Sequence, residues 1–213
     1  MRYLQRGLAA EGVTDHLFLR PLLLRVVDWI VLRDRLYDVE IPEIQPVLPG
    51  GRPVNDPAAV SEVLKRELIH LDLVFYHSDA KGNPQKAYKE RVGVVDAGGV
   101  VVVGVVPRHE TEAWIIAQPG MVAASLGVGV PRLGVPITSC RPGDVERDQD
   151  PKATLRSMLA GAAGGGRRRV RRVEDLLGVW AQRLDLDALT RLSQGRQLVD
   201  DTTAALRGLG VIR

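Results

Sequence analysis

The sequence contains a single cysteine, Cys140, among 213 residues. One thiol excludes an internal disulfide and any zinc site built from several cysteines. The chain also lacks the Gly-Lys-Ser/Thr ending of a Walker loop, the Gly-x-Ser-x-Gly turn of serine hydrolases and the His-Glu-x-x-His helix of zinc proteases. We therefore reject nucleotide hydrolysis, and no signature of either hydrolase class is present.

Long apolar runs are also missing. The N-terminus, MRYLQRGLAAEG, has no continuous apolar segment of the kind that a signal peptide needs. Polar residues or proline interrupt the apolar segment 17–33 at Arg20, Pro21, Arg25 and Asp28. We therefore expect no membrane span, and the scarcity of cysteine is compatible with a reducing cytoplasm.

Positive charge is distributed unevenly along the chain. The formal net charge is only +3, yet the stretch GGGRRRVRR contains Arg167, Arg168, Arg169, Arg171 and Arg172. A run of this kind is commonly a solvated, flexible segment, and it also offers an electrostatic site for nucleic acid or another polyanion. The sequence leaves both interpretations open.

Strand-like and helical patterns alternate along the first two thirds of the chain. Strands are predicted for apolar runs near residues 3–10, 39–44, 71–77 and 98–107. Helices are predicted to begin at Thr14, at Asp56 and Pro57, and near residues 84 and 110. This alternation predicts an α/β domain in which a mostly parallel sheet is flanked by helices.

The pattern changes in the last third of the chain. From residue 149 onward the sequence indicates short helices, interrupted by the glycine-rich stretch AGAAGGGRRR. We therefore expect an α/β domain over residues 1–148 and a C-terminal helical appendage over residues 149–213, with a flexible Gly/Arg-rich segment inside it.

Acidic and histidine side chains follow three of the predicted strands, at the point where each strand ends. Glu11 follows the first strand, His77 and Asp79 follow the third, and Glu110 and Glu112 follow the fourth. Because the carboxyl ends of parallel strands meet at one edge, we expect these side chains to converge there. Clustered carboxylates repel one another unless a cation or proton relieves them, and their oxygens suit Mg²⁺ or Mn²⁺.

Each of these residues also has a purely structural explanation. Glu11 before a helix favours the helix dipole, and Asp79 can cap the following turn. Asp15 could join the site as an outer ligand or act only as a first-turn helix acid. Lys81 could meet phosphates beside a metal or serve solubility alone. The joint placement of the acidic residues, rather than any one of them, favours a site.

Several stretches carry a resemblance to a known family. They are AAEGVTDHLFL after the first strand, FYHSDAKG after a buried strand, VPRHETEAWIIA before the helical region, and the later DPKATLRSML and RLDLDALTRL. Together they resemble the Toprim-like family of uncharacterised bacterial proteins related to the OLD-type nucleases. The likeness covers most of the chain.

The resemblance implies particular roles for individual residues. A general acid or base of the Toprim type falls on Glu11. The metal-binding Asp-x-Asp-x-x-Gly segment places its second aspartate on Asp79 and its glycine on Gly82, while His77 stands in place of the first aspartate. An imidazole can ligate Mn²⁺ or a softer metal but supplies no negative charge, which Glu110 or Glu112 could restore.

Two functions follow from the resemblance. The first is a metal-dependent phosphodiesterase or nuclease that acts on nucleic acid. The resemblance also implies that it works beside a separate ATPase, in defence against phage or other foreign DNA. Glu11 would be catalytic, and the candidate ligands of Mg²⁺ or Mn²⁺ are Asp79, His77, Glu112, Glu110 and Asp15.

The second function is that of a catalytically degenerate binding subunit for a partner ATPase or nucleic acid. In either, the arginine run and Lys81 would contact nucleic acid. Carboxylates of Glu11 and Asp79 within reach of one metal would favour the first function, and a salt bridge from a lysine or arginine that fills the site would favour the second.

Overall fold

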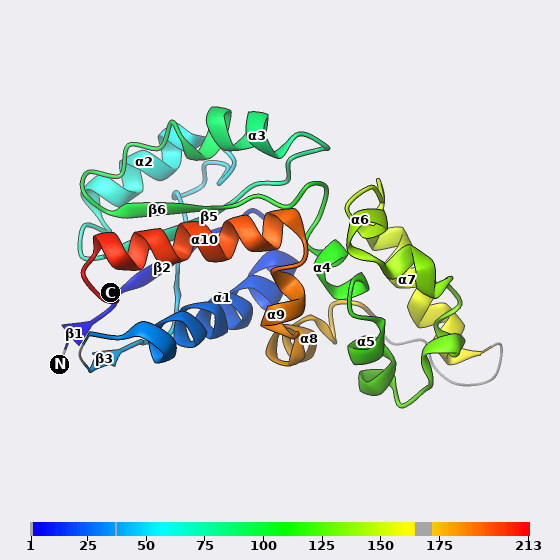
Figure 1. Cartoon of the computed structure of the whole chain (residues 1–213). Coiled ribbons are helices and arrows are strands. Elements are labelled where there is room, and N and C mark those ends of the chain that lie inside the picture. The colour runs from blue at the N-terminus through cyan, green and yellow to red at the C-terminus, as the bar shows by residue number, and fades with distance from the viewer. Residues whose placement is uncertain (1, 37, 165–171) are drawn as a thin grey trace.

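The structure is a computed structural model that describes residues 2–36, 38–164 and 172–213. Its centre is a four-stranded sheet in the order β4-β2-β5-β6, and each neighbouring pair is parallel (Figure 1). The strands are β2 (Arg6–Ala9), β4 (Gln45–Pro46), β5 (Leu73–His77) and β6 (Val101–Val105). A short parallel pair joins β1 (Arg2–Tyr3) to β3 (Val39–Glu40). The predicted α/β class with a mostly parallel sheet is confirmed.

The strand order creates a topological switch point between β2 and β5. From β2 the chain passes through α1 (Val13–Asp34) to β4 on one side of β2. From β4 it returns through α2 (Pro57–Arg66) to β5 on the other side. Ligands of open α/β sheets bind in the crevice at the carboxyl ends of strands beside such a point.

Helices cover both faces of the sheet (Figure 1). On one face α1 and α10 (Ser193–Gly208) pack over Phe75 and its neighbours, in the larger apolar cluster. On the other face, Tyr76 belongs to a second apolar cluster with α2, α3 (Pro84–Ala87) and a π-helical turn, η1 (Tyr88–Val92). Strand β5 is buried at each position because both of its faces are covered.

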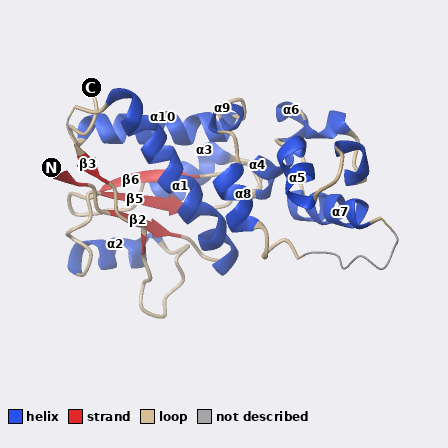
Figure 2. Cartoon of the chain, turned by 90° about the horizontal axis from the view of Figure 1, so that it is seen from below, coloured by secondary structure: helices blue, strands red, loops and turns tan. Residues whose placement is uncertain are grey.

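The helices α4 to α7 lie beyond the carboxyl edge of the sheet, to the right in Figures 1 and 2. The helices that follow β6 are α4 (Glu112–Ile116), α5 (Pro119–Leu126), α6 (Pro142–Val145), α7 (Pro151–Ala163), α8 (Leu177–Arg183) and α9 (Leu186–Leu189), with 3-10 turns at Val130–Leu133 and Ile137–Cys140. Helix α8 packs against α1, and α10 packs against β6. One apolar cluster therefore contains residues from both sides of position 148. The division into two domains at that position stays a prediction.

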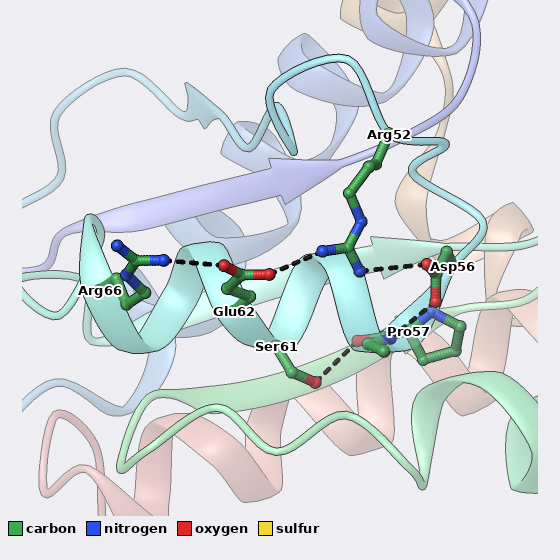
Figure 3. Close-up of polar contacts among 7 residues, drawn as sticks. Arg52, Asp56, Pro57, Ser61, Glu62 and Arg66 are labelled. Atoms are coloured by element: carbon green, nitrogen blue, oxygen red, sulfur yellow. Dashed lines mark hydrogen bonds and ion pairs between the residues drawn. The ribbon is translucent and has the colours of Figure 1, made fainter.

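Helix α2 illustrates how a local sequence sets an element and its surface. The side chain of Asp56 accepts a hydrogen bond from the first turn, and Pro57 occupies a position where a missing N–H costs little. On the outer surface Arg52 pairs with Asp56 and Glu62, and Arg66 pairs with Glu62 (Figure 3). We call these four charged residues the α2 network. Its charges are exposed and paired with one another.

The described helices include none that is both long enough and apolar enough to cross a membrane. This agrees with the interrupted apolar pattern of residues 17–33.

Candidate functional site

The loop after β5 is held against the chain that follows β6. Backbone hydrogen bonds run from Ser78 to Val105 at 3.1 Å, from Ala80 to Pro107 at 3.2 Å and from Gly82 to Arg108 at 2.7 Å. The chain turns at Lys81 (φ 49°) and Gly82 (φ 94°), a conformation that glycine adopts without strain and lysine rarely adopts. The loop therefore presents Asp79 and Lys81 beside residues 106–110 in a defined conformation.

His77 links the loops after β2 and β5. It ends β5 and is only 5% exposed. Its Nε2 lies 3.4 Å from Asp79 Oδ1, and its Nδ1 lies 3.9 Å from Asp15 Oδ2. The same oxygen of Asp15 accepts a hydrogen bond from the backbone N–H of Gly12 at 2.9 Å, at the start of α1. The structure thus brings together two of the predicted loops at the switch point.

Two atoms at this point are left without hydrogen bonds. His77 Nε2 and Asp79 Oδ1 are shielded from solvent and have no hydrogen-bond partner in the described part of the chain. Their separation of 3.4 Å is close to hydrogen-bonding distance, but their relative orientation is unsuitable. Such buried, unpaired polar atoms are uncommon in folded proteins and call for an explanation.

Lys152 brings a positive charge among the carboxylates. It lies in the first turn of α7, with Nζ 2.8 Å from Glu110 Oε1, and its backbone N–H donates to Glu110 Oε2 at 3.2 Å. Burial acts to lower the pKa of Lys152. The hydrogen bond to Glu110 and the negative charges of Glu112, Glu110 and Asp79 outweigh burial, so the pKa of Lys152 is raised. Lys152 therefore remains a cation that these carboxylates share.

Glu112 is the most deeply buried acid of the group. It lies in the first turn of α4 and is 5% exposed. Burial raises the pKa of Glu112; Lys152 opposes this rise, while the charges of Glu110 and Asp15 add to it. We refer to Asp15, His77, Asp79, Glu110, Glu112 and Lys152 as the carboxyl-edge cluster. Of the five residues that were predicted to converge, this cluster contains all except Glu11, and it also contains Asp15.

Glu11 lies apart from the ion pairs of the cluster. It follows β2 as predicted, but its side chain is exposed, and its Oε2 lies 3.5 Å from Asn55 Nδ2. Within the described ranges, no hydrogen bond or ion pair joins Glu11 to Asp79. Both residues belong to loops at the same edge of the sheet, as predicted. The catalytic role of Glu11 stays a prediction, because none of its contacts in the described part of the chain tests that role.

An open cavity of about 800 Å³ lies beside the cluster. Its lining includes Asp79, Lys81, Arg108, His109, Glu110 and Arg147. We call it the carboxyl-edge cavity. One lysine and two arginines line it, of which Arg147 also pairs with Asp144 at 2.6 Å. A concave surface with several cations attracts anionic ligands and raises their local concentration.

The donor set, as it is arranged, does not fit Mg²⁺ or Mn²⁺. No group of three or more His, Cys, Asp or Glu side chains within residues 2–36, 38–164 and 172–213 could hold a metal ion. Glu110 is paired with Lys152, and Asp15 accepts from the backbone of Gly12. These hard cations need about six oxygen ligands, including water. Lys152 forms an ion pair with Glu110, one of the residues that were expected to bind a metal.

The predicted arginine run falls mostly outside the structure. Arg167, Arg168, Arg169 and Arg171 lie outside the described residues. Arg172 is described and is exposed just before α8. Lys81, the other predicted nucleic-acid contact, lines the carboxyl-edge cavity. Of the basic candidates, the structure therefore connects Lys81 to the candidate site.

Three residues at the site, Lys152, Arg108 and Arg147, were not predicted from the sequence. The Asp-Pro-Lys sequence at 150–152 predicts the start of a helix, and Asp150 indeed caps α7 by accepting from Ala153 N at 2.9 Å. That signal places Lys152 in a first turn, but it does not say which loop the turn faces. The partner of Lys152, Glu110, is 42 residues earlier in the chain.

The fold and the site define an α/β domain with a charged cavity at the carboxyl edge of a parallel sheet. Compared with known proteins, the chain matches no family model, no curated protein and no solved structure. The resemblance to Toprim-like proteins therefore depends on the sequence motifs.

Proposed function

We propose that this chain is a Toprim-like binding module for nucleic acid, in which Lys152 neutralises the inner carboxylates. The observation that carries this proposal is the ion pair between Lys152 Nζ and Glu110 Oε1 at 2.8 Å, with Asp79 and Glu112 close enough to raise the pKa of the lysine. A cationic side chain in the acidic site is the arrangement expected of a domain that binds without a catalytic metal.

The outer part of the site supplies the binding surface. Lys81, Arg108 and Arg147 line the carboxyl-edge cavity, and phosphate groups are the anions that such side chains contact in nucleic acids. These contacts do not read the base sequence, and they weaken as salt rises. The arginine run that ends at Arg172 would add further phosphate contacts.

A second function, a metal-dependent phosphodiesterase or nuclease, is favoured by one specific observation. His77 Nε2 and Asp79 Oδ1 are buried, lie 3.4 Å apart and lack hydrogen-bond partners among the described residues. Functional sites are places where such a cost is tolerated. In this function Glu11 would be the general acid or base, and Glu110 or Glu112 would have to separate from Lys152. The resemblance extends either function to a partner ATPase and to defence against foreign DNA.

Fluorescence anisotropy with labelled single-stranded and duplex DNA tests the binding function. In EDTA we expect saturable binding whose affinity falls steeply with salt concentration. Lys81→Ser and Arg108→Ser should each weaken binding, whereas Arg66→Ser, which removes an exposed arginine of the α2 network, should leave it unchanged. Binding that is absent in EDTA, or is insensitive to both cavity variants, would contradict the proposal.

A cleavage assay separates the second function from the first. Plasmid and single-stranded DNA are incubated with the protein in Mg²⁺ or Mn²⁺. Cleavage that Asp79→Asn and Glu11→Gln both abolish would establish the nuclease in place of the binding module.

A further inference from the structure

A second cavity lies between the α3–η1 segment and α10, on residues that the carboxyl-edge cavity does not use. Its volume is about 380 Å³, at the small end of the range for ligand pockets. Its lining includes Gln85, Tyr88, Lys89, Gln194, Gln197 and Asp201. Tyr88 forms the aromatic wall of this cavity. Its polar wall consists of three glutamine amides and the carboxylate of Asp201, which are directional hydrogen-bonding groups.

The aromatic wall is fixed by the sheet. A Cβ atom added to Gly104 of β6 would lie 2.6 Å from Tyr88 Cε2, so the tyrosine ring is packed directly against the backbone of the strand. Tyr88 begins the π-helical turn η1, and turns of this kind are frequent at functional sites. The ring is therefore held in place at the cavity, and its position depends on a glycine in β6.

Asp201, which lines the polar wall, has one carboxylate oxygen without a hydrogen-bond partner among the described residues. Asp201 Oδ1 accepts a hydrogen bond from Gln197 Nε2 at 2.7 Å. Asp201 Oδ2 is shielded from solvent and has no hydrogen-bond partner in the described ranges. Burial raises the pKa of Asp201; Gln197 opposes this effect and Asp200 adds to it. Burial also raises the pKa of Tyr88, and the charge of Asp201 contributes. The two side chains thus share a partly desolvated environment.

We propose that this cavity binds a planar nitrogen heterocycle that carries an amino group, such as an adenine or cytosine ring. A flat ring suits the space beside Tyr88, and base stacking on aromatic side chains is a general mode of recognition. The amides of Gln194 and Gln197 can donate and accept at once, as the edge of such a ring requires. The exocyclic amino group would donate to the carboxylate of Asp201, and uracil and thymine rings carry no such group.

The ring can come from a free nucleoside or from a base in a nucleic-acid strand, and the experiment separates these sources. The proposal does not depend on phosphate binding at the carboxyl-edge cavity. In one arm, adenosine, cytidine and uridine are titrated into the ¹⁵N-labelled protein, and chemical shifts are followed by NMR. In the other arm, anisotropy compares oligo-dA, oligo-dC and oligo-dT.

We expect adenosine or cytidine to shift resonances of α3, η1 and α10 and to bind at least ~10-fold more tightly than uridine. Asp201→Asn should remove that preference, while Asp200→Asn, an exposed neighbour on the same helix, should retain it. Matching circular dichroism spectra and melting temperatures show that both variants fold. A preference for oligo-dA or oligo-dC that depends on Asp201, without nucleoside binding, would assign the ring to a strand. If neither arm shows an effect of Asp201→Asn, the proposal is wrong.

Discussion

The α2 network and the carboxyl-edge cluster contain the same kinds of charged residue in different surroundings. In the α2 network the charges are exposed, and hydrogen bonds lower the pKa of its acids. The backbone of Ala58 has the largest effect on Asp56, and Arg66 followed by Arg52 on Glu62. In the carboxyl-edge cluster, burial raises the pKa of Glu112, and His77 Nε2 and Asp79 Oδ1 lack hydrogen-bond partners in the described chain.

The difference shows which cluster is suited to function. Exposed pairs contribute little to folding and are easily replaced, because water competes with each partner. Buried charges that are only partly paired are expensive, and perturbed groups of this kind gather at functional sites more often than elsewhere. The carboxyl-edge cluster should therefore respond to substitution much more strongly than the α2 network does.

The largest effect is expected from removing the shared cation. Lys152→Met keeps an unbranched side chain of similar length but leaves Glu110 and Glu112 without their positive partner. After allowance for the solvent screening of a half-exposed lysine, we expect a loss of about 1.5 kcal/mol in the free energy of unfolding. Urea denaturation at pH 7 measures it.

The matched control for this loss is Lys65→Met. Lys65 pairs with Asp96 at the exposed surface beside α2. We expect a much smaller change in the urea midpoint than for Lys152→Met. Equal changes for the two lysines would show that the more buried acidic partner of Lys152 has no energetic consequence.

The next effect is a dependence on pH. Because the pKa of Glu112 in the folded protein is raised above its ordinary value of 4.5, the folded state binds this proton more tightly than the unfolded state does. The native protein therefore loses stability as pH rises from about 4.5 through the raised pKa. Glu112→Gln should remove this loss, so its stability relative to the native protein should increase across that window. Thermal unfolding between pH 4 and pH 8 measures the difference.

Glu62→Gln provides a comparison of opposite sign. The pKa of Glu62 is lowered by hydrogen bonds from Arg66 and Arg52, so its contribution is present above the ordinary pKa and is lost as pH falls. Relative to the native protein, Glu62→Gln should therefore lose stability as pH rises. If Glu112→Gln and Glu62→Gln show the same slope, the contrast between the two clusters fails.

The smallest effect is expected within the α2 network itself. Arg52→Ser removes the pairs with Asp56 and Glu62, both of which are solvent-exposed. We expect a change in melting temperature close to the reproducibility of the measurement, further reduced in 0.5 M NaCl compared with 0.05 M. If Arg52→Ser lowered the melting temperature as much as Lys152→Met does, the contrast between the two clusters would be wrong.

Much of the fold could be predicted from the sequence because local patterns carry the information. The all-apolar run that ends at His77 predicts a strand buried on both faces, and Asp56 with Pro57 predicts the start of α2; the structure has both. Alternation of strands and helices predicts the parallel sheet. The parallel order also explains why the loops that carry Glu11, His77 and Glu110 end at one edge.

The partners of these residues could not be predicted, because they come from distant parts of the chain. Lys152 reaches Glu110 only because α7 packs beside α4. The second cavity forms between α3 and α10, which are separated by about half the chain. Neither contact leaves a periodic or motif-like signal in the sequence, since tertiary packing alone decides which helices become neighbours.

In the proposed binding module Lys152, rather than a metal ion, neutralises the acidic residues at the carboxyl edge. Isothermal titration calorimetry of Mn²⁺ into the native protein and into Lys152→Met distinguishes the two. We predict no saturable binding to the native protein at up to millimolar Mn²⁺, and binding to Lys152→Met that Asp79→Asn abolishes in the double variant. Tight binding of Mn²⁺ to the native protein, lost on Asp79→Asn and unaffected by Lys152→Met, would contradict the claim and favour the metal-dependent nuclease.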